Sequence, residues 1–118
     1  MHDHTNGNIN RTLGVRFLND QFRRTLDAKL GRVLCTGGVQ ALPDADRCVL
    51  LAMVQNFSGF NEGNDPHKEH DFGRIHYKGT DYFFKIDYFD KELRFLSEDA
   101  SDPTRCTRIM TVMRADEY

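Results

Sequence analysis

The segment His70–Phe89, HDFGRIHYKGTDYFFKIDYF, decides the fold because its side chains alternate with the two-residue period of a β-strand. Two runs, residues 70–77 and 82–89, flank Lys78-Gly79-Thr80-Asp81, which is typical of a hairpin turn. In the second run one face is apolar, formed by Tyr82, Phe84, Ile86 and Tyr88. The other face is mixed, with Phe83, Lys85, Asp87 and Phe89. We expect the apolar face to pack against helices.

The position of the turn also predicts which residues of the two strands pair. A turn centred on Gly79-Thr80 places Tyr77 opposite Tyr82 and Gly73 opposite Ile86. Asp71 would then lie opposite Tyr88. His70 and Asp71 would approach the end of the second strand at residues 87–90, where the carboxylates need a basic group or a cation beside them.

Helices are predicted on the N-terminal side of this hairpin. Residues 9–26 have the helical period, because Ile9, Leu13 and Phe17 continue into a second apolar row that ends at Leu26. Together the two rows make one broad stripe, of the kind that packs onto a core. Residues 44–58 form a second, more apolar helix that Pro43 introduces.

Short strands complete the expected fold. Residues 32–36 read as a strand that ends at a Gly37-Gly38 turn, residues 93–97 as another, and residues 107–114 as a strand that is apolar on both sides and therefore central. The sequence thus predicts an α+β fold: two helices packed on one face of a four- to five-stranded, mainly antiparallel sheet. Connections between consecutive strands are short, which favours a meander.

Length and composition place these elements in one domain. Residues 1–8 are expected to form a flexible leader and residues 9–118 a single domain. The leader lacks the features of a secretory signal, and no apolar run reaches the roughly 20 residues that span a bilayer. Three well-separated cysteines predict neither a disulfide framework nor a zinc ribbon. A cytoplasmic protein without membrane contact is expected.

Charge is unevenly distributed along the chain, whose net charge is -2. Residues 58–104 carry eleven acidic and six basic side chains, and both flanking segments are mildly basic. An acidic surface that meets a basic protein partner is therefore favoured. Direct nucleic-acid binding is unlikely from composition and would depend on four arginines of the first helix: Arg11, Arg16, Arg23 and Arg24.

Ionisable side chains gather between residues 65 and 90. A divalent metal ion held by His67, His70 and Asp71 is one interpretation, since imidazole and carboxylate groups are its usual ligands. A hydrolase with His70, Asp71, Lys85 and Asp87 as catalytic residues is the related enzymatic interpretation. Alternatively, Asp65, His70 and Asp71 fix the loop by local hydrogen bonds, and Lys85 forms a salt bridge with Asp87.

Several motifs resemble those of a small bacterial family, the domain of unknown function numbered 3768. They are Leu18-Asn19-Asp20, Asn64-Asp65-Pro66, Glu69-His70-Asp71-Phe72-Gly73, Lys85-Ile86-Asp87-Tyr88 and Arg108-Ile109-Met110-Thr111-Val112-Met113. The resemblance implies a cytoplasmic bacterial protein, often from mobile elements, and lends no activity, cofactor or catalytic residue. The mobile-element context implies an accessory or counter-defence role, such as an anti-CRISPR or anti-restriction inhibitor.

The leading hypothesis is a non-enzymatic protein-binding domain without a cofactor, whose partner could be a host defence complex. Its binding surface would combine the acidic loop with the outer sheet face, through Glu62, Asp65, Glu69, Asp71, Phe83 and Phe89. The alternative is a metal-dependent hydrolase with a His/Asp cluster at residues 65–90. The sequence leaves both hypotheses open.

Overall fold

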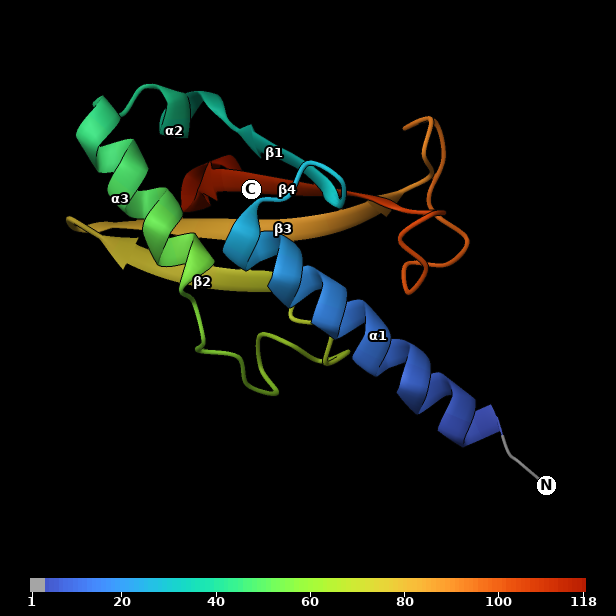
Figure 1. Ribbon diagram of the computed structural model, residues 1–118. Helices are drawn as coiled ribbons and strands as arrows, with labels where there is room; N and C mark the ends of the chain where they lie inside the picture. The colour runs from blue at the N-terminus through green and yellow to red at the C-terminus, as the bar shows by residue number, and fades with distance from the viewer. Residues whose placement is uncertain (1–3) are drawn as a thin grey trace.

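The structure is a computed structural model that describes residues 4–118. Three helices lie in the N-terminal half: α1 (His4–Thr25), α2 (Gly37–Gln40) and α3 (Asp44–Gln55) (Figure 1). The strands are β1 (Gly31–Cys35), β2 (Phe72–Tyr77), β3 (Thr80–Phe89) and β4 (Thr107–Arg114), and the 3-10 helix η1 (Ala115–Glu117) follows. The expected leader falls partly outside the described residues, and α1 begins at His4 rather than at Ile9.

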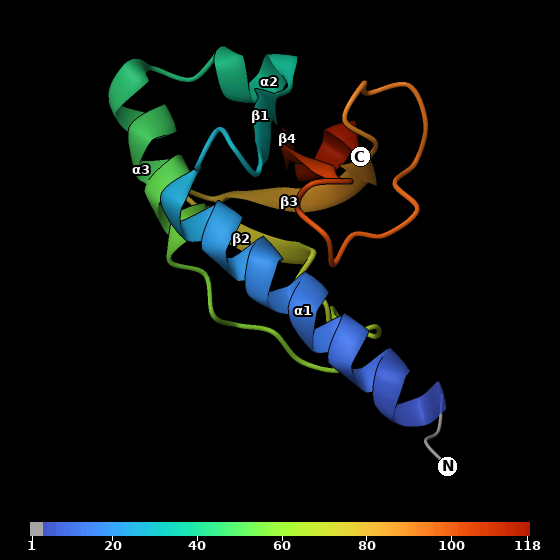
Figure 2. The same cartoon turned by 45° about the vertical axis from the view of Figure 1, so that its right-hand side comes forward.

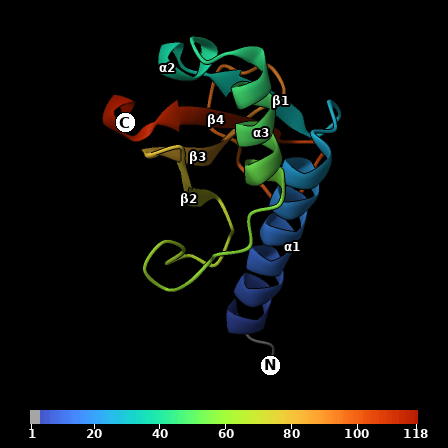
Figure 3. The same ribbon diagram turned by 90° about the vertical axis from the view of Figure 1, so that its left-hand side faces the viewer.

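The four strands form one sheet in the order β1-β4-β3-β2. Pairs β2–β3 and β3–β4 are antiparallel, and β1 joins β4 in parallel. Figure 3 shows β4, β3 and β2 in succession. An α+β fold with a four-stranded, mainly antiparallel sheet is therefore confirmed, as is the central position of β4. The parallel pair needs a long connection, which α2, α3 and the β2–β3 hairpin supply.

The core forms where the helices meet the apolar face of the hairpin. As expected, Tyr82, Phe84 and Ile86 of β3 are buried. They belong to one cluster with residues from all three helices and from the neighbouring strands: Phe22, Val39, Leu50, Val54, Ile75, Met110 and Val112. Gly73 of β2 lies under the rings of Phe84 and Phe57, where a Cβ atom would be 2.3 Å from the Phe84 ring. Only glycine fits there.

The predicted hairpin register is wrong by two residues. The turn consists of Lys78 and Gly79 alone, with φ of 48° and 79°, the pattern of a two-residue type I′ turn. Tyr77 therefore pairs with Thr80, and Gly73 pairs with Phe84. The sequence favoured the wider turn because a left-handed lysine is uncommon.

The predicted strand at 93–97 and the Gly37-Gly38 turn are also wrong. Residues 90–106 are irregular apart from one bridge between Phe89 and Leu96, which forms beyond Lys85, where the pairing of β2 with β3 stops. Leu93 takes a left-handed conformation with φ of 59° and reverses the chain. Gly37 and Gly38 begin the short helix α2.

Helix α1 differs most from its predicted packing. Its buried side chains are Val15, Asn19, Phe22 and Arg23. The expected row of Ile9, Leu13 and Phe17 is exposed, with 52%, 45% and 65% of each residue accessible. Figures 1 and 2 show that the N-terminal half of α1 extends beyond the sheet, so the residues of that half have little core to meet. Phe17 belongs to the C-terminal half and is exposed because it lies on the side of the helix away from the buried Val15 and Asn19. None of the described helices is long and apolar enough to cross a membrane.

Candidate functional site

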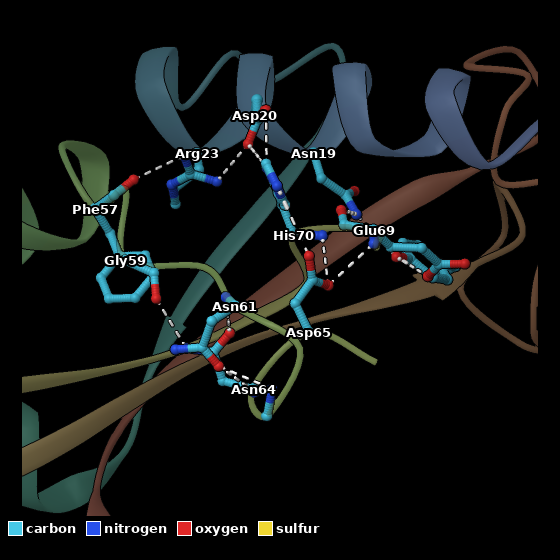
Figure 4. Close-up of polar contacts among 12 residues, drawn as sticks. Asn19, Asp20, Arg23, Phe57, Gly59, Asn61, Asn64, Asp65, Glu69 and His70 are labelled. Carbon is cyan, nitrogen blue, oxygen red and sulfur yellow. Dashed lines mark hydrogen bonds and ion pairs between the residues drawn. The ribbon is translucent and has the colours of Figure 1, made fainter. Parts of the chain in front are cut away.

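A polar cluster fastens α1 to the long loop between α3 and β2. We use this name for Asn19, Asp20, Arg23, Asp65, Glu69, His70, Tyr88 and Arg108. Figure 4 shows His70 between Asp20 of α1 and Asp65 of the loop. His70 Nδ1 lies 2.9 Å and 3.0 Å from the two Asp20 oxygens, and His70 Nε2 lies 3.7 Å from Asp65 Oδ2. The His70 ring stacks on Phe60 at 3.9 Å.

Arg23 completes this half of the cluster. It is fully buried, and its Nη1 donates to Asp20 Oδ1 at 2.9 Å while its Nη2 donates to the Phe57 carbonyl at 3.2 Å. Its guanidinium also lies 5.1 Å from the centre of the Phe60 ring. Burial lowers the pKa of Arg23, and the hydrogen bond to Asp20 opposes that change. Its Nε finds no partner among the described residues.

The other half of the cluster centres on Asn19, which is also fully buried. Asn19 Nδ2 donates to the Glu69 carbonyl at 2.9 Å and to the Tyr88 hydroxyl at 2.8 Å. Asn19 Oδ1 accepts from Arg108 Nε at 2.6 Å. Tyr88 in turn donates to Glu69 Oε1 at 2.8 Å, and burial raises the pKa of its phenol. The cluster thus joins α1, the loop, β3 and β4.

The backbone conformation of the loop positions His70 beside Asp20. Lys68 and His70 are left-handed, with φ of 59° and 57°. Asp65, which is buried, holds this turn because its Oδ1 accepts the backbone N–H groups of Glu69 and His70, both at 3.0 Å. Charge-assisted bonds of this kind offset the cost of left-handed backbone. This agrees with the interpretation of Asp65 as a local cap.

An outer pocket of about 400 Å³ lies between the loop, β3 and Tyr118. Its charged or imidazole side chains are those of His67, Asp71, Lys85 and Asp87. Lys85 Nζ lies 3.3 Å from Asp87 Oδ2, as the salt-bridge interpretation predicted. Burial, and then the charge of Glu69, raise the pKa of Asp71. Asp71 approaches β3 through its carbonyl, which accepts the Ile86 N–H at 2.8 Å.

The hydrolase set is therefore only partly assembled. Asp71, Lys85 and Asp87 share the outer pocket, but His70 points to Asp20 and does not line it. Among the described residues, no three His, Cys, Asp or Glu side chains are arranged to hold a metal ion. His67, His70 and Asp71 accordingly do not form such a group.

The six residues of the predicted binding surface occupy different environments. Glu62 is exposed, whereas Asp65 is buried and Glu69 is half-buried against Tyr88. Asp71, Phe83 and Phe89 are half-buried. Phe83 contacts the rings of Phe72 and Tyr118 on the outer sheet face. Of the predicted arginine patch, Arg23 is buried, so the four arginines do not share one surface.

Sequence reasoning missed a groove beside α1. It has a volume of about 590 Å³ and is lined by Ile9, Thr12, Leu13, Arg16, Pro66, His67 and Lys68. We call it the α1 groove, and we call Ile9, Leu13 and Phe17 the α1 row. A second hollow is lined by Phe17 together with Asp20, Gln21, Arg24 and Thr25. The i, i+4, i+8 spacing was visible in the sequence, but it was assigned to the core.

Comparison with known proteins gives a family and no activity. The family model described as "Protein of unknown function (DUF3768)" matches residues 35–117, which is more than half of the chain and includes the loop, the hairpin and β4. The match begins after α1, so the α1 row lies outside the matched residues. No curated protein and no solved structure matched the chain.

Proposed function

The chain belongs to the DUF3768 family, whose description names no activity, and we propose that it is a non-enzymatic protein-binding domain that docks through the α1 row. The supporting observation is the exposure of three large apolar side chains on one side of one helix. Fully burying each such side chain stabilises a complex by about 1.5–3 kcal/mol. Contiguous exposed apolar surface of this kind is typical of interaction sites.

The geometry of α1 supports docking over internal packing. Residues two positions apart on a helix point about 200° apart, so Val15 faces the core while Leu13 faces away. The polar cluster holds the C-terminal half of α1, at Asn19, Asp20 and Arg23, against the loop. The α1 row is thus presented by an anchored helix, and little ordering entropy opposes binding.

A photo-crosslinking amino acid at position 13, in cells that express the protein, tests this proposal. We expect a discrete crosslinked partner that a Phe17→Asp substitution abolishes. The matched control carries the crosslinker at Val49 of α3, which is 44% exposed, compared with 45% for Leu13. Equal crosslinking at both positions, or crosslinking that ignores Phe17→Asp, would reject the α1 row as the docking surface.

The same crosslinking experiment distinguishes docking through the α1 row from docking through the acidic surface that the sequence predicted. Glu62→Lys should leave the crosslink intact if the α1 row docks, whereas an acidic docking surface requires its loss. Inhibition of a host defence system is the form of this function that the mobile-element context favours. Identification of the crosslinked partner by mass spectrometry tests whether the protein inhibits a defence system. A metabolic enzyme as the partner would contradict such inhibition.

A hydrolase is the second candidate, favoured by the shared pocket of Asp71, Lys85 and Asp87. A half-buried carboxyl with a raised pKa in the same pocket as a lysine is a pattern found in acid–base catalysis. The test is a screen of the purified chain against ester and phosphoester substrates, with Asp71→Asn and Lys85→Met as variants. Hydrolysis that both variants abolish would support the enzyme; hydrolysis that persists in both would reject this pocket.

A further inference from the structure

The charged side chains that line the α1 groove are basic. Arg16 projects from α1 and Lys68 from the loop, and His67 lies beside them. No aspartate or glutamate of the described residues lines the groove. Its apolar lining residues are Ile9, Leu13 and Pro66. The groove therefore combines apolar lining residues with basic ones.

These two cations are available to a partner. Within the described part of the chain, neither Arg16 nor Lys68 forms an ion pair with a carboxylate at 4.0 Å or closer. Lys68 is held in place because the Asp65 carboxylate fixes the residues that follow it. Glu62 lines the adjoining hollow with Arg16 and Lys68 but is exposed. Asp65 lines the same hollow, and its Oδ1 already accepts hydrogen bonds from the backbone N–H groups of Glu69 and His70.

Resting on the proposed function, we infer that the partner contributes an amphipathic helix whose apolar row packs on the α1 row and whose acidic flank lies over Arg16 and Lys68. The α1 row spans nine residues, or about 12 Å of helix axis, which suits the i, i+4 and i+8 ridges of a second helix. Helices that bind in this way present apolar anchors at the same spacing. Opposite charge at the rim sets their orientation.

Two other occupants fit the observations less well. A second copy that packs α1 on α1 would bring Arg11 and Arg16 of both copies into one interface, which is unfavourable between like charges. A nucleic acid would need a basic stripe, but Arg23 is buried and the groove has apolar lining residues. Both remain outcomes of the test below.

The probe is a displayed library of helical peptides with leucine fixed at i, i+4 and i+8 and with each flanking position drawn from Glu, Gln and Lys. We expect selection on the purified chain to enrich Glu on one flank only. The double variant Arg16→Glu/Lys68→Glu should bind an enriched peptide about tenfold more weakly, since two exposed ion pairs are lost. Lys29→Glu/Lys91→Glu, which reverses two exposed lysines outside the groove, should bind it unchanged.

A substitution at Glu62 should change peptide binding in the opposite direction. Glu62→Gln removes a carboxylate that competes for Arg16 and Lys68, so binding of the enriched peptide should strengthen by up to about threefold. Lys68 is exposed, so Lys68→Glu alone serves if the double variant does not fold. No enrichment, enrichment of Gln or Lys, or weaker binding by Glu62→Gln would overturn the inference.

The outcomes also separate this inference from the proposed function. Peptides that depend on Phe17 but show no acidic preference would overturn the acidic helix and leave the docking surface standing. Peptides that bind Phe17→Asp as well as wild type would overturn both. A dimer of the chain alone, measured by light scattering and lost in Leu13→Asp, would assign the groove to a second copy; tight binding of duplex DNA would assign it to nucleic acid.

Discussion

The two sides of α1 depart from the usual distribution of polar and apolar residues, because polar side chains are buried beside Val15 and Phe22 while large apolar side chains are exposed. On the inward side, Asn19 and Arg23 are fully buried; on the outward side, Leu13 and Phe17 are exposed. The difference follows the direction in which each side chain points, because the inward side of α1 contacts the loop, β3 and β4, whereas Leu13 and Phe17 lie on the other side. Whether a side chain of α1 is buried therefore depends on which other elements pack against it. The polarity of the side chain alone does not predict its burial.

The buried polar residues are stable because almost every donor and acceptor has a partner. Asn19 bonds to three groups from the loop, β3 and β4, and Arg23 bonds to Asp20 and to the Phe57 carbonyl. Unpaired buried polar groups are costly, so each partner matters. The exposed α1 row has no such partners, and its removal should cost little. Four substitutions test this contrast.

Arg23→Ala should have the largest effect. Removal of the guanidinium leaves the largely buried Asp20 without its arginine partner, and losing one side of such an ion pair costs about 3–5 kcal/mol of unfolding free energy. Urea denaturation measures it. The neighbouring Arg24→Ala is the control, because Arg24 is exposed and its loss should stay within about 0.5 kcal/mol. Similar losses in both variants would contradict the structural role of Arg23.

Asn19→Ala should follow, with a loss of about 1–3 kcal/mol, because Arg108, Tyr88 and the Glu69 carbonyl each lose a buried hydrogen-bond partner. Asn10→Ala is the matched control: the same substitution on the exposed side of α1 carries the same gain in helix propensity. The difference between the two urea midpoints isolates the buried contacts. A difference near zero would show that Asn19 is solvated.

Asp71→Asn should have a smaller, pH-dependent effect. Burial raises the pKa of Asp71 in the folded protein, so the folded state holds its proton more tightly than the unfolded state. This stability is fully present below the unfolded pKa of about 3.9 and is lost as the pH rises through the folded pKa. The variant should lack this loss and should be more stable at neutral pH. Thermal midpoints across the acidic to neutral range measure it, with exposed Glu62→Gln as the control.

Phe17→Ser should have the smallest effect on the isolated chain, within about 0.5 kcal/mol, because the side chain is exposed. Phe22→Ala on the inward side of the same helix should cost about 3–5 kcal/mol, the usual loss for a buried phenylalanine. Differential scanning calorimetry compares the two. A large loss for Phe17→Ser would mean that the α1 row is packed and is not a docking surface.

Elements with strong local signals were predictable from the sequence. The alternation of Tyr82, Phe84 and Ile86 identified the buried face of β3, and the two-sided apolar pattern of residues 107–114 identified a central strand. Pro43 marked the start of α3. The strand predicted at 93–97 is reduced to one bridge at Leu96, because Leu93 takes a left-handed conformation that the alternation of side chains does not report.

The candidate site was predicted less well. Residues 65–71 were correctly singled out as ionisable, but their partners come from α1 and lie 50 positions away: Asp20 for His70 and Asn19 for the Glu69 carbonyl. The predicted cluster of His70, Asp71 and Asp87 assumed a hairpin register that a two-residue turn replaces. Contacts over such separations leave no periodic signal in one sequence.

The sequence by itself determined the α+β class, the main helices and strands and the buried face of the hairpin, because backbone propensity and side-chain periodicity are local properties. Only the tertiary structure decided which side of α1 is buried, where the acidic side chains of the loop point and that the α1 groove exists. Those features depend on where α1 ends relative to the sheet. That position is fixed by contacts such as Asn19 with Arg108, between residues 89 positions apart.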